Sequence, residues 1–224
     1  MRRLLTYYPT VAATFMALSA ICTCGHMHGQ SQVPPPTEKH YYEVRSGDKS
    51  VGEVLAEKKT VGDLTRYEVR SNVTISMVFK VHVAYKVIAT YRDGIMEAST
   101  ATVYVNGSVK NQVDALRNGD HYEVVIDGDI TLFYANITAS SATLYFAKPL
   151  VGTAMFSETS GVLKVFTAMR DGRLMLREPD SDSNHNTYLY KNDHLLTEVA
   201  IERFLFPSLS LHHTGYERPG LGFK

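Results

Sequence analysis

Apolar and polar residues alternate along the middle of the chain, from Tyr67 to Tyr91. Ser71 is the exception in an odd-numbered apolar series made up of Val69, Val73, Ile75, Met77, Phe79, Val81, Val83, Tyr85, Val87 and Ala89. Because side chains of a strand point alternately to opposite faces, this period of two predicts extended structure with one buried face. At about 3.3 Å per residue one strand of this length would span roughly 80 Å, so we expect it to bend around a barrel or strongly curled sheet.

Turn dipeptides divide the rest of the chain into short segments rich in Tyr, Val, Thr and Ile. They are Gly47-Asp48, Gly62-Asp63, Asp93-Gly94, Asn106-Gly107, Asn118-Gly119, Asp127-Gly128, Asp171-Gly172 and Asn192-Asp193. Such residues tolerate the positive φ of tight hairpin turns. Short, regular spacing between turns joins antiparallel neighbours, which favours an up-and-down meander over parallel strands joined by helices.

We therefore predict an all-β fold: an antiparallel up-and-down meander that forms a strongly curled sheet or a partly closed barrel. A two-sheet β-sandwich is the alternative. One short helix is expected at 137–146, with Asn136 as its cap and Pro149 ending it. Such a helix could lie across an open end of the sheet and close the core.

The N-terminal segment has the layout of a secretory signal peptide. Arg2 and Arg3 precede an apolar stretch over 11–21, and no acidic residue occurs before Glu38. The stretch is shorter than the roughly twenty residues that a membrane-spanning helix needs, so no transmembrane span is expected in the mature chain. Cleavage after Ala20 and cleavage near residue 29 both fit. We expect export to the periplasm or association with the outer membrane.

Both cysteines, Cys22 and Cys24, lie just after this apolar stretch and are candidates for lipidation. A mature chain that starts near Gln30 would contain no cysteine and no disulfide. We expect a signal peptide at 1–29, a Pro-rich linker at 30–37, one β-rich domain at 38–207 and a C-terminal tail at 208–224. One domain of this size can bury a sizeable core.

The charge balance bears on possible partners. Arg2 and Arg3 belong to the expected signal peptide. Without them the chain has 21 of its 23 basic residues, compared with 23 acidic residues. This near-neutral balance lacks the basic surface typical of nucleic-acid binding. No phosphate-binding loop or paired zinc spacing occurs, so we predict no cofactor and no nucleic-acid partner.

Several phrases follow one another in an order that resembles a known family. They are an opening strand that ends at Gly47, then Val51–Val54, the long alternating segment, Tyr104–Gly107, Leu144–Pro149, Phe156–Glu158 and Thr187–Asn192. This order is similar to an uncharacterised family of exported proteins found mainly in Bacteroidota and classified only as a domain of unknown function. Asp193 stands where the family pattern favours Gly. The resemblance implies an exported β-rich domain and supplies no substrate.

Candidate ligand-binding residues lie on the predicted strands and turns. Glu158 stands between apolar segments, where burial would raise the pKa of its carboxyl and require a partner. Tyr188 and Tyr190 alternate on one strand face and could line a cavity or complete a core. Met77 and Phe79 belong to the long apolar face. A structural hydrogen bond or ion pair would explain Glu158 equally well.

Other groups could carry chemistry but favour simpler interpretations. A group of residues whose side chains could bind a soft metal ion lies at the end of the leader: Cys22, Cys24, His26, Met27 and His28. Cleavage near residue 29 would discard it, so we predict no metal site. His185 lies near Asp180 and Asp182 in what we interpret as a solvated polar loop, and the pair His212–His213 as part of a tail. No nucleophile elbow is present, and we predict no catalytic residue.

The pattern thus favours a non-enzymatic binding or scaffolding domain of the cell envelope for an apolar or lipid-like ligand. The alternative is a structural domain that meets an envelope protein through the outward residues Lys80, His82 and Lys86. A hydrolase that uses Glu158 or His185 is the third hypothesis.

Overall fold

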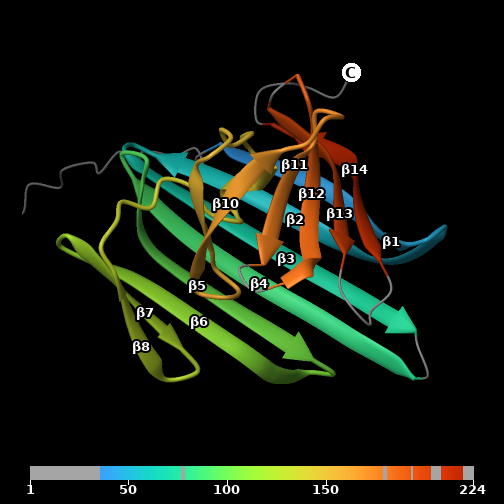
Figure 1. Cartoon of the computed structure of the whole chain (residues 1–224), viewed down its shortest axis with the longest axis horizontal. Helices are drawn as coiled ribbons and strands as arrows, with labels where there is room; N and C mark the ends of the chain where they lie inside the picture. The colour runs from blue at the N-terminus through green and yellow to red at the C-terminus, as the bar shows by residue number, and fades with distance from the viewer. Residues whose placement is uncertain (1–35, 77–78, 179–180, 193, 203–207, 219–224) are drawn as a thin grey trace, which may run out of the picture. The chain divides into compact units, whose positions relative to one another are not determined.

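The computed structural model describes residues 36–76, 79–178, 181–192, 194–202 and 208–218, all of them within the compact unit Pro34–Lys224. Almost all regular structure in these residues is β (Figure 1). The strands are β1 Thr37–Ser46, β2 Lys49–Val61, β3 Leu64–Ser76, β4 Lys80–Arg92, β5 Ile95–Val105, β6 Ser108–Asn118, β7 His121–Ile126, β8 Asp129–Phe133, β9 Ala154–Ser157, β10 Val162–Ala168, β11 Leu174–Glu178, β12 Ser181–Lys191, β13 Leu195–Glu202 and β14 Leu209–Glu217.

All these strands form one 14-stranded antiparallel sheet in the order β8-β7-β6-β5-β4-β3-β2-β1-β14-β13-β12-β11-β10-β9. Two meanders, β1–β8 and β9–β14, are joined where β1 pairs with β14. The sheet curls without closing, since β8 and β9 remain its two edges. The turn after β9 nevertheless meets β6, because Asn111 Nδ2 donates to the Thr159 carbonyl at 2.7 Å. The predicted curled meander is confirmed, and the sandwich alternative is not what forms.

The long alternating segment is a hairpin and not one bent strand. It forms β3 and β4, in which Ser76 pairs with Lys80 and Val73 pairs with Val83. This register sets odd-numbered residues opposite odd-numbered residues, so both strands present their odd positions to the same face. The alternation therefore continues through the turn. No Gly, Pro or Asn lies between these strands to mark it.

The predicted turn dipeptides are confirmed where the structure describes both residues, and Asp193 of Asn192-Asp193 lies outside the described residues. Asp93, Asn106, Asp127 and Asn192 have φ values between 49° and 54°, in the left-handed region. Asn106 is followed by Gly107 at φ 83°, and such a pair of positive φ values produces the twist that suits a two-residue hairpin.

Two polar segments join the sheet against expectation. Residues 181–191, which contain the expected solvated loop around His185, form β12 between β11 and β13. Residues 209–217 of the expected tail form β14, which pairs with both β1 and β13. In both strands tertiary pairing overrides a polar local composition.

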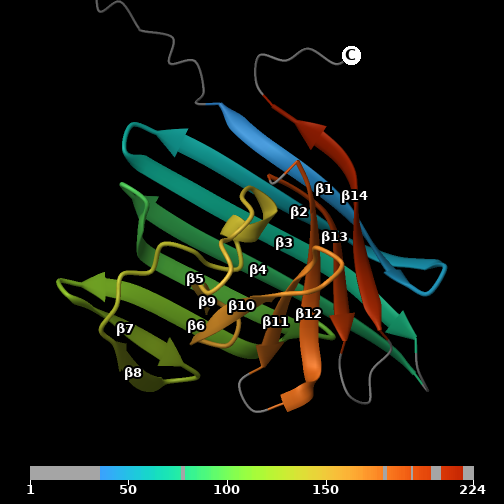
Figure 2. The same ribbon diagram turned by 45° about the horizontal axis from the view of Figure 1, so that its top comes forward.

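The helix expected at 137–146 is wrong apart from one 3-10 turn, Thr143–Tyr145, with Ala142 and not Asn136 at its N-cap position. The preceding backbone bonds to the sheet, because Met96 N donates to the Ile137 carbonyl and Phe156 N to the Ala139 carbonyl. These bonds use groups that a helix would need internally. Figure 2 shows the yellow turn beside the long strands and β9–β14. We call residues 134–153 the connecting segment.

The meander defines two ends. Turns that follow odd-numbered strands lie at one end, and turns that follow even-numbered strands lie at the other, where the connecting segment leaves β8 and enters β9. The connecting segment covers this second end: Phe146 packs against Tyr67 with ring centroids 5.5 Å apart and against His40 at 5.0 Å. The core thus lies inside the curled sheet, with one end covered.

Candidate functional site

The interior of the curled sheet contains a cavity of about 480 Å³. Most of its wall is aliphatic because inward positions of the strands are occupied by Val, Leu and Ile. The aliphatic lining comprises Val44, Val54, Val69, Val73, Ile75, Val83, Val87, Val103, Leu144, Leu176, Leu196, Val199, Ile201, Leu209 and Leu211. The cavity is therefore a predominantly apolar space bounded by both halves of the sheet.

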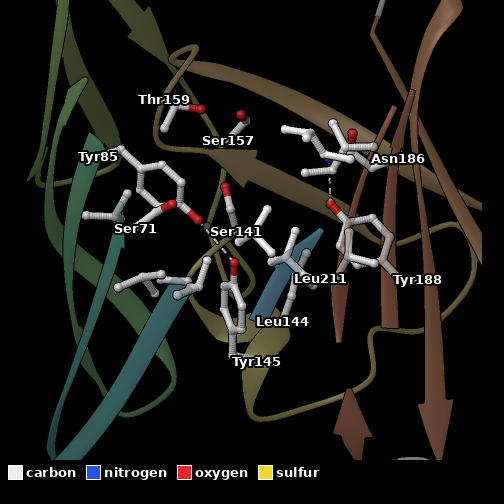
Figure 3. A pocket seen from close by; sticks show the side chains of 18 of the residues that line it. Ser71, Tyr85, Ser141, Leu144, Tyr145, Ser157, Thr159, Asn186, Tyr188 and Leu211 are labelled. Carbon is white, nitrogen blue, oxygen red and sulfur yellow. Dashed lines mark hydrogen bonds between the residues drawn. The ribbon is translucent and has the colours of Figure 1, made fainter. Parts of the chain in front are cut away.

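A polar strip crosses the wall near the connecting segment (Figure 3). It contains Ser71, Tyr85, Ser141 and Tyr145, and the two phenol oxygens of Tyr85 and Tyr145 lie 3.2 Å apart. Burial raises the pKa of both phenols, that of Tyr145 well above its usual value. Both side chains are therefore neutral at physiological pH and offer dipoles, not charges.

A second polar region lies on β9 to β12. Ser157, Thr159, Lys164, Asn186 and Tyr188 all line the cavity there, and Asn186 Nδ2 donates to Tyr188 Oη at 3.2 Å (Figure 3). Hydroxyl and amide groups of this kind orient a bound molecule, whereas the aliphatic wall supplies contact area.

Glu158 holds the connecting segment beside the cavity. Its carboxylate is fully buried and accepts hydrogen bonds from Ser141 N at 2.8 Å, Ser141 Oγ at 2.6 Å and Ala142 N at 3.2 Å. Burial raises the pKa of this carboxyl above 4.5, although hydrogen bonds from serine and backbone donors oppose the shift. The group faces the connecting segment and is outside the cavity lining.

Two tyrosines support the same segment from the sheet. Tyr190 Oη donates to the Leu144 carbonyl at 2.9 Å, and the ring of Tyr42 packs edge-on against Tyr145 with centroids 5.3 Å apart. These contacts stabilise the covered end of the sheet and place Leu144 and Tyr145 in the cavity wall.

The opposite end is more open. The lining side chains that stand close to the turns after odd-numbered strands, Ile75, Val83, Val103, Thr159, Ile201 and Leu209, are half-buried. Ala142 and Leu144 at the covered end are buried. The cavity therefore approaches the surface at the end that the connecting segment does not cover.

The structure separates the candidate ligand residues. Tyr188 lines the cavity, whereas Tyr190 and Glu158 contact the connecting segment. Phe79 is 73% exposed in the connection between β3 and β4 and does not line the cavity. Met77 and the cysteines Cys22 and Cys24 lie outside the described residues.

His212 and His213 lie within β14 and make separate contacts. His212 bonds Ser210 on its own strand at 2.9 Å, and His213 packs beside His40 with ring centroids 5.5 Å apart. Among the described residues no group of three or more His, Cys, Asp or Glu side chains is placed to hold a metal ion. The described part of the chain also contains no helix long and apolar enough to cross a membrane.

Sequence reasoning missed Lys164, Asn186 and Ser71 as cavity residues. A signal was present for Lys164, since it alternates with Val162 and Phe166 and therefore shares the face of the buried Phe166. A lysine on a strand is ordinarily assigned to the solvent face, and only the curl of the sheet turns this one inward.

The family model of a domain of unknown function, DUF6134, matches residues 42–206. A search of curated proteins gives no match. The fold is similar to the crystal structure of a β-barrel-like protein of domain of unknown function DUF1849 from Brucella abortus, with a TM-score of 0.55 and 9% sequence identity. The similarity covers 82% of this chain and 97% of that chain, and it concerns the fold alone.

Proposed function

Since the chain belongs to the DUF6134 family, a domain of unknown function, we propose from the cavity itself that the protein binds an apolar, lipid-like small molecule inside its curled sheet. The observation that carries this proposal is a cavity of about 480 Å³ with an aliphatic wall and two polar regions. Pockets for small molecules commonly measure about 300–1,000 Å³ and combine apolar walls with a few oriented polar groups.

The construction of the wall supports binding over a merely structural role. Interiors of folded domains are close-packed, and voids larger than a water molecule are few. Val69, Val73 and Val87 could be replaced by Leu or Phe to fill the space, yet these inward positions hold smaller side chains. An apolar ligand would supply the contacts that this wall lacks.

The covered end supports the same proposal. Glu158 and Tyr190 hold the connecting segment at one end of the cavity, and half-buried residues surround the other. A ligand would enter through this second end. Together with the signal-like leader, this arrangement fits a carrier or scaffold of the cell envelope, which we propose as its location.

A neutral environment-sensitive dye, N-phenyl-1-naphthylamine, tests the proposal. We expect its fluorescence to increase on binding, and a Val103→Phe substitution in the half-buried lining to weaken binding by about tenfold. Val109→Phe is the matched control, because Val109 is 58% exposed on β6 and does not line the cavity.

Native mass spectrometry of protein purified without detergent would detect a natural ligand that co-purifies with the protein. A co-purified acyl species would support the proposal. No increase in dye fluorescence with the wild type, or equal dye affinities for V103F and V109F, would overturn it.

A further inference from the structure

Ser71 interrupts the apolar alternation of β3 at a position that faces the cavity. It is the exception in the odd-numbered series from Val69 to Ala89, it is only 7% exposed, and it lines the cavity. A hydroxyl group in an aliphatic wall costs free energy unless it is hydrogen-bonded. A valine at this position would continue the wall, so the serine needs a reason beyond packing.

The register places a second hydroxyl group beside Ser71. Ser71 pairs with Tyr85 of β4, so both side chains lie on the inward face. The phenol oxygen of Tyr85 lies 3.2 Å from that of Tyr145, which the connecting segment brings to the cavity (Figure 3). Burial raises the pKa of Tyr85, and hydrogen bonds with Tyr145 and Ser71 oppose this rise. We call Ser71, Tyr85 and Tyr145 the hydroxyl cluster.

The hydroxyl cluster has more donors than internal contacts. Each hydroxyl carries one O–H donor, whereas at most two contacts join the three groups, Ser71 with Tyr85 and Tyr85 with Tyr145. The part of the chain that the structure describes supplies no further hydrogen-bond partner for these hydroxyls. At least one O–H group of the cluster is therefore available to an acceptor inside the cavity.

The surroundings of the hydroxyl cluster disfavour a negative charge. Charge repulsion from the Glu158 carboxylate also raises the pKa of Tyr85, so this carboxylate opposes a negative charge at the phenol oxygen. Glu158 is fully buried and bonded to Ser141 and Ala142 of the connecting segment. An anionic group bound at the cluster would meet the same repulsion, whereas a neutral oxygen would not.

The wall on either side of the hydroxyl cluster is aliphatic. Ser71 pairs with Val54 of β2 and Tyr85 pairs with Val103 of β5, and both valines line the cavity. An apolar chain fits along these valines while an oxygen at its end reaches the hydroxyls. Resting on the proposed function, we propose that the ligand is a single-chain lipid with a neutral oxygen head, of the fatty alcohol or fatty ester class, and that the hydroxyl cluster binds this oxygen.

Competition against bound N-phenyl-1-naphthylamine tests this assignment with three probes of equal chain length: decan-1-ol, methyl decanoate and decanoate. At about pH 8 the decanoate head is ionised. We expect the wild type to bind at least one neutral probe about tenfold or more tightly than decanoate, because the carboxylate would lose its hydration near the charge of Glu158. The order of the two neutral probes distinguishes a hydroxyl head from an ester head.

Variants assign the preference to the hydroxyl cluster. Tyr85→Phe and Tyr145→Phe each remove one hydroxyl with little change of shape. Each should weaken the binding of the preferred neutral probe about fivefold, as expected for one hydrogen bond, and leave the affinity for the dye within about twofold. Tyr134→Phe is the matched control and should change neither affinity, because Tyr134 is 70% exposed and does not line the cavity. Ser71→Ala repeats the test from β3 if a phenol variant does not fold.

The outcomes separate the two proposals. If the dye does not bind, the proposed function itself fails. If the dye binds but neither neutral probe displaces it, or if decanoate binds as tightly as they do, the neutral head is overturned and an apolar ligand remains in place. Affinity for the neutral probe that is unchanged in both Y85F and Y145F would overturn the role of the hydroxyl cluster.

Discussion

Removing the Glu158 carboxylate tests how the connecting segment is held at the covered end. This buried group accepts hydrogen bonds from the backbone N–H groups of Ser141 and Ala142 and from Ser141 Oγ. Glu158→Ala leaves all three donors without their acceptor. Each such loss costs about 1–3 kcal/mol when the donor is buried, and Ser141 is partly accessible, so E158A should lower the free energy of unfolding by about 3–5 kcal/mol.

Glu158→Gln is the milder change. The amide oxygen can keep the bonds that Oε2 accepts from Ser141, while the amide nitrogen faces the N–H of Ala142, which loses its acceptor. We therefore expect E158Q to lower the free energy of unfolding by about 1–3 kcal/mol in mildly acidic solution.

The pH dependence has a definite sign. Burial raises the pKa of Glu158 above 4.5, so the folded protein holds this proton more tightly than the unfolded chain does. The resulting stability is fully present below the unfolded pKa and is lost as the pH rises through the folded pKa. Because Gln does not titrate, the stability advantage of the wild type over E158Q should be largest near about pH 4.5 and should narrow toward pH 8.

Urea unfolding followed by circular dichroism at several pH values between these limits measures both effects. Glu53→Gln is the control, since Glu53 is exposed on β2 and its substitution should change stability by less than about 0.5 kcal/mol. A loss below about 1 kcal/mol in E158A, or an advantage over E158Q that widens as the pH rises, would refute the reasoning.

Two further predictions concern the wall of the sheet. Gly52→Ala should destabilise the protein by about 2 kcal/mol or more, because the new Cβ would lie 2.1 Å from the Asn72 carbonyl oxygen. Gly215→Ala is the control and should cost less than about 0.5 kcal/mol, because its Cβ would meet nothing nearer than 3.5 Å. Equal midpoints of urea unfolding for the two variants would contradict this prediction. Burial and the neighbouring His40 lower the pKa of His213, so its contribution to stability is present above about pH 6.5 and is lost as the pH falls. The melting temperature of the wild type should therefore fall relative to that of His213→Phe between about pH 7 and pH 5, and parallel curves would contradict the assignment.

Local signals predicted much of the fold. Period-two alternation and dipeptides such as Asn106-Gly107 identified strands and turns, because strand faces and positive φ depend on neighbouring residues. The same local logic failed between β3 and β4, whose connecting sequence has no Gly or Pro, and at 137–141, where the backbone bonds to the sheet. The polar segment around His185 joined the sheet for the same reason.

The candidate site was harder to predict than the fold. Tyr188 was identified as a cavity candidate from its strand alternation, and it lines the cavity. Glu158 was correctly expected to need partners when buried, but these partners, Ser141 and Ala142, could not be named. Lys164 shares a strand face with Phe166, but a lysine is ordinarily assigned to the solvent face, so only the curl of the sheet showed that this one points inward.

The sequence by itself determined that this chain forms antiparallel strands joined by tight turns, because these features depend on side-chain period and backbone preference within a few residues. Only the tertiary structure decided that β1 pairs with β14, that the sheet curls without closing and that the connecting segment covers one end. Those outcomes depend on contacts between residues far apart in the chain. The cavity and the inward position of Lys164 follow from them.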